Sequence, residues 1–207
     1  MMISTGKNFG FVCVPKCGST SIEHAIRPHC NIKLSGNPRI KHMTYMDAEQ
    51  YIFPMLATKQ LDRPHMFAVI REPIDWLGSW YRYRSRKELK GTNNYAGDHS
   101  FEEFVRYCCS PNGPSFARVQ DQSRFLVNAE GKVGVDTVLL YDQLGTSLPK
   151  FFKQFGIKMQ SLPRKNVSAI KADVTAGLDE EYIEMAKENF AADYAILREI
   201  RQSTAPS

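Results

Sequence analysis

Several features that would narrow the function at once are missing from this chain of 207 residues. Its five cysteines are odd in number and irregularly spaced, which argues against a disulfide framework. No CxxC pair and no paired histidines accompany Cys13 and Cys17, so we expect no metal site. Buried thiols in a reducing compartment explain the cysteines better.

Long apolar runs and a strong excess of one charge are also absent. No stretch approaches the length of a membrane span, and no basic region precedes an apolar run at the N-terminus. We therefore expect a cytoplasmic protein without stable membrane insertion. The net charge of +5 fits a protein that handles an anionic ligand. Aromatic residues do not accompany the charges of residues 82–90 in a groove-like pattern, so nucleic acid is not an expected partner.

The apolar patterning predicts one α/β domain over residues 1–207. Continuous apolar runs, typical of strands buried on both faces, lie at residues 9–14, 66–70 and 137–141. Helical patterns alternate with them at residues 19–27, from 73, at 100–109, 146–155 and 178–200. Ser100 and Glu103 form a capping box, and Thr146 is placed to cap the next helix. The alternation predicts a mostly parallel central sheet flanked by helices.

The segment PKCGSTS, residues 15–21, joins the first apolar run to the first helical pattern. In a strand–turn–helix unit, the N–H groups of the turn and the positive end of the helix dipole favour an anion. Gly18 allows close backbone approach, and Lys16 adds a full charge. The lysine precedes the glycine, so this is not the GxxxxGK[ST] loop of ATPases and GTPases. The segment predicts a phosphate-like ligand held by Lys16, Cys17, Gly18, Ser19, Thr20 and Ser21.

A second motif, FAVIREPIDWLGSWY at residues 67–81, has a similar arrangement. Its apolar run ends at Arg71, and Pro73 then opens a helix. Ser79 follows Arg71 after about two helical turns. An arginine fork with a hydroxyl group can hold a phosphate bidentately. Two anion sites at neighbouring strand ends predict one ligand with two separated phosphate-like groups.

Together, in this order, the two motifs resemble the sulfotransferase superfamily, whose enzymes use 3′-phosphoadenosine 5′-phosphosulfate (PAPS). The first is similar to their 5′-phosphosulfate loop and the second to their 3′-phosphate site. KHMTYMDAEQY, residues 41–51, resembles a segment of the carbohydrate 2-O-sulfotransferase branch in which a histidine is the proposed base. The resemblance implies a P-loop-like sulfotransferase fold and sulfuryl transfer to a hydroxyl acceptor, a glycan or a small molecule, without a metal.

The resemblance also implies roles for individual residues. His42 matches the general base, and Lys16 would stabilise charge on the departing 5′-phosphate. LPRKNVSAIK resembles a late basic loop that closes over the 3′-phosphate, which gives Arg164 and Lys165 roles in cofactor binding. Glu23, on the face of the helix after the first motif, is expected to be solvated.

Three alternatives stay open. His65, at the entry to the second apolar run, competes with His42 as the base. A P-loop-type small-molecule kinase would need ATP with magnesium, and the missing GK[ST] pattern argues against it. A non-catalytic nucleotide-binding module would have kept the fold and lost the chemistry, which the presence of both Lys16 and His42 disfavours. The sequence indicates neither the identity of the acceptor nor an oligomeric state.

Overall fold

The computed structural model describes residues 1–159 and 175–204, and the chain divides into two compact units. The first unit contains the described residues of Met1–Arg71 and Gln122–Asn166. The second contains the described residues of Glu72–Asp121 and Val167–Ser207. The single domain predicted for residues 1–207 stays a prediction.

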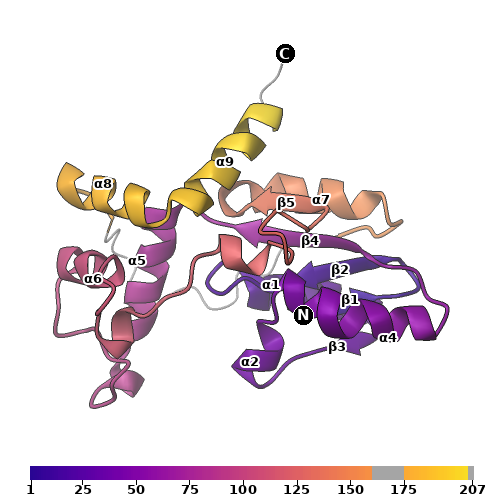
Figure 1. The fold of residues 1–207 in the computed structure, drawn as a ribbon, viewed down its shortest axis with the longest axis horizontal. Helices are drawn as coiled ribbons and strands as arrows, with labels where there is room; N and C mark the ends of the chain where they lie inside the picture. The colour runs from indigo at the N-terminus through magenta and orange to yellow at the C-terminus, as the bar shows by residue number, and fades with distance from the viewer. Residues whose placement is uncertain (160–174, 205–207) are drawn as a thin grey trace. The chain divides into compact units, whose positions relative to one another are not determined.

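The first unit contains a five-stranded sheet with the order β3-β1-β2-β4-β5 (Figure 1). The strands are β1 (Met2–Ser4), β2 (Phe9–Val12), β3 (Ile32–Lys33), β4 (His65–Ile70) and β5 (Thr137–Leu140). The three predicted strands are β2, β4 and β5, and they pair in parallel. β1 pairs antiparallel with β2 and with β3, so the sheet is mixed. The prediction of a mostly parallel sheet therefore holds only for the three predicted strands, because β1 and β3 are too short to carry a pattern.

The helices of the first unit follow β2, β3 and β5 in the chain. They are α1 (Ser19–Ile26), α2 (Pro38–Lys41), α3 (Tyr45–Asp47), α4 (Phe53–Thr58) and α7 (Leu144–Lys153), with a π-helical turn at Ala48–Ile52. The predicted cap of α7 is wrong, because the helix begins before Thr146, whose hydroxyl donates to the Gln143 carbonyl at 3.1 Å. Gly156 follows the helix in a left-handed conformation with φ of 68°, as expected of a terminating glycine.

Aromatic rings between the sheet and α7 form much of the core of this unit. Phe11 of β2 stacks on Phe67 of β4 with ring centroids 4.8 Å apart. Phe9 and Phe67 each meet the ring of Phe152 on α7 edge to face. These contacts hold β2 and β4 side by side, with Val12 opposite Ala68. Because the two strands are parallel, the segments after β2 and β4 leave the sheet at the same edge.

The second unit is helical in its described residues, with α5 (Pro73–Arg84), α6 (Phe101–Cys108), α8 (Glu180–Asn189) and α9 (Ala191–Thr204). The predicted capping box of Ser100 and Glu103 is present and opens α6. The single helix predicted over residues 178–200 is wrong, because Phe190 leaves the helical conformation between α8 and α9. The buried ring of Phe190 packs edge to face on Trp76 of α5, with centroids 5.7 Å apart.

Candidate functional site

The loop between β2 and α1 contains the first predicted anion site. Lys16 and Gly18 both have left-handed backbones, with φ of 65° and 75°. These two residues let the chain turn sharply into the first turn of α1, where backbone N–H groups point out of the helix end. A Cβ at Gly18 would lie only 3.1 Å from a ring carbon of Tyr141, so glycine is needed there for space as well as for φ.

The side chains of this loop differ in exposure. Lys16 and Ser21 are half-buried, and Thr20 is exposed at the start of α1. Cys17 and Ser19 are buried, with exposed fractions of 1% and 7%. Of the three predicted hydroxyl donors, Thr20 and Ser21 are therefore more open to a ligand than Ser19, whose role stays a prediction.

Gln122 links this loop to the end of β4. Its side-chain oxygen accepts hydrogen bonds from the Cys17 thiol at 3.1 Å and from the Arg71 backbone N–H at 2.8 Å. Its amide nitrogen donates to the Arg71 carbonyl at 2.8 Å. Gln122 is completely buried, and no sequence pattern distinguishes it, since it is one polar residue in an irregular segment. The structure thus connects the two predicted motifs through a residue distant from both in the sequence.

Arg71 lies at the same edge of the sheet as the loop. Its guanidinium carbon is 4.3 Å from the centroid of the Tyr141 ring, the ring that Gly18 also approaches. Tyr141, directly after β5, therefore lies beside both motifs, and sequence reasoning did not select it. Stacking engages the face of a guanidinium, whereas its N–H groups donate in the plane, so stacking orients the fork without blocking it.

His42 directly follows α2, and its ring is held by the backbone beyond β2. Its Nδ1 lies 2.6 Å from the carbonyl oxygen of Cys13. Because a carbonyl oxygen only accepts, Nδ1 carries the proton and Nε2 keeps its lone pair. Burial, reinforced by the positive charge of Lys41, lowers the pKa of His42 below its ordinary value of 6.5. The ring is therefore neutral near pH 7 and able to accept a proton at Nε2.

Glu23 is not the solvated helix-face carboxylate that was expected. Its side chain is only 13% exposed, and Oε2 lies 2.9 Å from the ammonium of Lys41. Its Oε1 accepts a hydrogen bond from the Cys13 thiol at 3.2 Å. Burial raises the pKa of that thiol to about 12, so Cys13 keeps its proton and remains a donor.

The competing base, His65, occupies the other edge of the sheet. It is the first residue of β4, whereas Arg71 follows the last. Its Nε2 lies 2.8 Å from the Thr137 hydroxyl, and its ring packs near Phe151 and Phe155. These contacts give His65 a structural role at the sheet edge remote from the loop.

The structure does not test the assignment of three further predicted site residues. Ser79 is half-buried on α5, in the second unit, so its partnership with Arg71 stays a prediction. Arg164 and Lys165 lie outside the described residues. The part of the site that the structure describes therefore consists of the β2–α1 loop, the end of β4, His42 and the residues that contact them.

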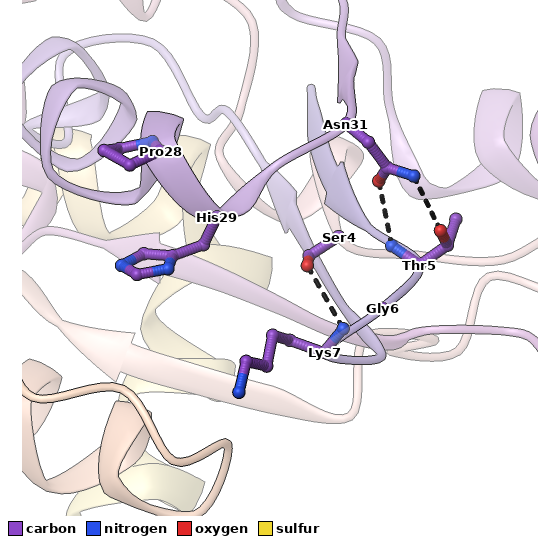
Figure 2. A pocket seen from close by; sticks show the side chains of 7 residues that line it. All are labelled: Ser4, Thr5, Gly6, Lys7, Pro28, His29 and Asn31. Atoms are coloured by element: carbon purple, nitrogen blue, oxygen red, sulfur yellow. Dashed lines mark hydrogen bonds between the residues drawn. The ribbon is translucent and has the colours of Figure 1, made fainter.

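A hollow of about 460 Å³ lies at the turn between β1 and β2 (Figure 2). Two of its side chains pair with each other: the Asn31 amide donates to the Thr5 hydroxyl at 2.7 Å. The Ser4 hydroxyl accepts from the Lys7 backbone N–H at 3.2 Å. Among the residues that the structure describes, none of those predicted to bind the cofactor lines this hollow.

The described residues contain neither a candidate metal site nor a candidate membrane span. Within residues 1–159 and 175–204, no three or more His, Cys, Asp or Glu side chains are arranged to hold a metal ion. No helix in the same residues combines the length and the apolar character needed to cross a membrane.

Comparison with known proteins identifies the family. No curated protein and no solved structure matches the chain. The family model described as "Sulfotransferase family" matches residues 1–198, nearly the whole length. Such enzymes move a sulfuryl group from a sulfate donor to a hydroxyl-bearing acceptor, and the two predicted motifs fall within the matched range. The chain belongs to the sulfotransferase family and is a transferase.

Proposed function

We propose that the protein transfers the sulfuryl group of PAPS to a hydroxyl group of a carbohydrate. One observation carries the proposal: the loop after β2 and Arg71 after β4 leave parallel neighbouring strands and are both bonded to the buried Gln122. Lys16 and Arg71 thus provide cations at adjacent strand ends. PAPS carries anionic groups at both of its ends, which suits such a pair.

The β2–α1 loop suits the phosphosulfate end of this donor. The left-handed Lys16 and Gly18 shape the turn, the first turn of α1 offers N–H groups, and the Lys16 ammonium adds charge. Arg71, oriented by the Tyr141 ring, would hold the 3′-phosphate through its planar fork. The chemistry of these residues therefore fits a P-loop-like site that binds PAPS.

In the proposed reaction His42 is the general base. Its Nε2 accepts the proton of the acceptor hydroxyl while the acceptor oxygen bonds to sulfur and the bond from sulfur to the 5′-phosphate oxygen breaks. Lys16 stabilises the charge on the departing phosphate. Adenosine 3′,5′-bisphosphate leaves, and the acceptor becomes a sulfate ester. The hydrogen bond from Nδ1 to Cys13 supports this role because it fixes the tautomer that a base needs.

The carbohydrate acceptor rests on the likeness of residues 41–51 to carbohydrate 2-O-sulfotransferases. Incubation with ³⁵S-labelled PAPS and a panel of glycans, lipids and small alcohols tests it, with label expected on a glycan. Label on a lipid or a simple alcohol alone would replace the carbohydrate by that acceptor.

Calorimetry with two nucleotides tests the donor. We expect adenosine 3′,5′-bisphosphate to bind without magnesium, and ATP with magnesium not to bind. The reverse result would support a small-molecule kinase. Binding of the bisphosphate without transfer of label to any acceptor would support a non-catalytic module.

A further inference from the structure

Lys41 is a second lysine beside the β2–α1 loop, in addition to Lys16. It is the last residue of α2, directly before His42. Its ammonium lies 2.9 Å from Glu23 Oε2 and 3.5 Å from the hydroxyl of Thr20. The Lys41 side chain is 19% exposed, so the ammonium is held beside the loop and still reaches solvent.

Glu23 places this ammonium. The carboxylate projects from α1 one turn after Thr20 and is itself fixed by the Cys13 thiol. An ammonium has three N–H donors, and Glu23 and Thr20 engage two of them. The contact to Thr20 is at the outer limit of a hydrogen bond, so an anionic ligand at the loop can replace it at little cost. Lys41 is therefore a pre-positioned cation with donor capacity for an anion.

Stability alone gives a weak reason for the pair of Lys41 and Glu23. The pair is mostly buried, and the cost of desolvating two charges largely offsets their attraction. A cation held at a reaction centre before the ligand binds, in contrast, stabilises negative charge without reorganisation during the reaction. The position of Lys41, between Thr20 of the loop and the adjacent His42, places it at the end of the site where transfer occurs.

We propose that Lys41 is a further catalytic residue, which contacts the sulfuryl oxygens of the donor while Glu23 positions it. This inference rests on the proposed function. The base must lie near the attacking hydroxyl, and that hydroxyl must lie in line with sulfur, so the neighbour of His42 is close to the sulfuryl group. Lys16, in the turn after β2, is assigned to the departing phosphate. The two lysines thus share the charge of the phosphosulfate.

Binding of two nucleotides to Lys41→Gln tests the inference. PAPS carries the sulfuryl group, whereas adenosine 3′,5′-bisphosphate lacks it, and both are measured by calorimetry without acceptor. We expect Lys41→Gln to weaken PAPS binding roughly tenfold and to change bisphosphate binding less than about twofold, because one charge-assisted hydrogen bond is lost. The single-turnover rate should fall by more than about tenfold. Lys41→Arg, which keeps the charge, should recover much of the PAPS affinity.

The matched control is Lys59→Gln, which removes an exposed lysine after α4 in the same unit and should change neither affinity. Melting temperatures of all variants show whether each is folded, and Lys41→Met serves as a second neutral variant. An equal loss of affinity for both nucleotides would overturn the sulfuryl contact. Unchanged binding and rate would reduce Lys41 to a structural partner of Glu23. Failure of the wild-type protein to bind either nucleotide would instead refute the proposed function itself.

Discussion

The two edges of the sheet in the first unit carry similar residue types in different settings. At the loop edge stand Lys16 and His42, and at the opposite edge stand Lys7 and His65. Both edges have left-handed residues other than glycine, Lys16 and Asn8, and both have hydrogen bonds between distant segments. The edges differ in their histidines: His42 bonds to a backbone carbonyl, whereas His65 pairs with the hydroxyl of Thr137 on a strand.

The difference shows that residue type alone does not define a site. The Nδ1 of His42 is bonded to a backbone carbonyl, which leaves Nε2 as an acceptor. His65 has its Nε2 engaged with Thr137 and its ring packed near phenylalanines. The proposed base and its competitor therefore differ in which ring nitrogen is engaged by a contact within the fold.

Replacing each of the two histidines by alanine in turn should give the largest difference in turnover between the two edges. His42→Ala is expected to lower turnover by about 10²–10⁴-fold, because the proton acceptor is lost, with affinity for adenosine 3′,5′-bisphosphate nearly unchanged. His65→Ala should leave turnover within a few-fold and lower the melting temperature, since it loses the bond to Thr137. Single-turnover kinetics and calorimetry measure both. Near-normal turnover of His42→Ala would refute the assignment.

Removing the cations should have the next largest effect. Lys16→Ala and Arg71→Ala are each expected to weaken binding of the bisphosphate by about 10–100-fold, as a lost charge-assisted contact of about 1.5–3 kcal/mol implies. Lys7→Ala, at the opposite edge, should change it less than about twofold. Calorimetry gives the three values. A comparable loss for Lys7→Ala would mean that the nucleotide binds near the β1–β2 turn instead of the β2–α1 loop.

Removing the buried link should weaken both stability and binding. Gln122→Ala removes the hydrogen bonds of this side chain to the Cys17 thiol and to the Arg71 backbone, so we expect a loss of about 1–3 kcal/mol in unfolding free energy. Bisphosphate binding should weaken several-fold because the two strand ends are no longer tied. Gln120→Ala is the matched control, since Gln120 is exposed. Equal melting temperatures for the two variants would contradict the role of Gln122.

The pH dependence should show the smallest effect. His42 must be neutral to accept a proton, and burial lowers its pKa below 6.5, so the acid limb of kcat/KM should have its midpoint below pH 6.5. The same lowering means that the unfolded chain binds this proton more readily. The associated stability is therefore present above pH 6.5 and is lost as the pH falls through the folded-state pKa. An acid limb with its midpoint above pH 6.5 would contradict the lowered pKa.

The local patterns of the sequence predicted much of the fold. β2, β4 and β5 lie at their predicted apolar runs. β2 and β4 are buried almost throughout, as such runs predict, whereas β5, at the end of the strand order, is half-buried at three of its four residues. The break at Phe190 was missed because it depends on packing against Trp76, which no local pattern encodes. β1 and β3 are too short to be periodic.

Lys16, Gly18 and Arg71 could be proposed from the sequence because charge and glycine mark the ends of two apolar runs, and their roles stay predictions. Gln122 and Tyr141 could not be found, because their importance arises from contacts between segments far apart in the chain. The same holds for Glu23, whose ion pair with Lys41 requires α1 and α2 to meet. The sequence therefore predicted the main secondary structure better than the polar contacts between distant segments.

A crystal structure with adenosine 3′,5′-bisphosphate tests whether the β2–α1 loop and Arg71 hold the two ends of one nucleotide. We expect the 5′-phosphate within hydrogen-bond distance of the loop N–H groups and the Lys16 ammonium, and the 3′-phosphate within hydrogen-bond distance of the Arg71 guanidinium. A nucleotide bound in the hollow beside Lys7, or at the loop with both Lys16 and Arg71 turned away, would contradict it.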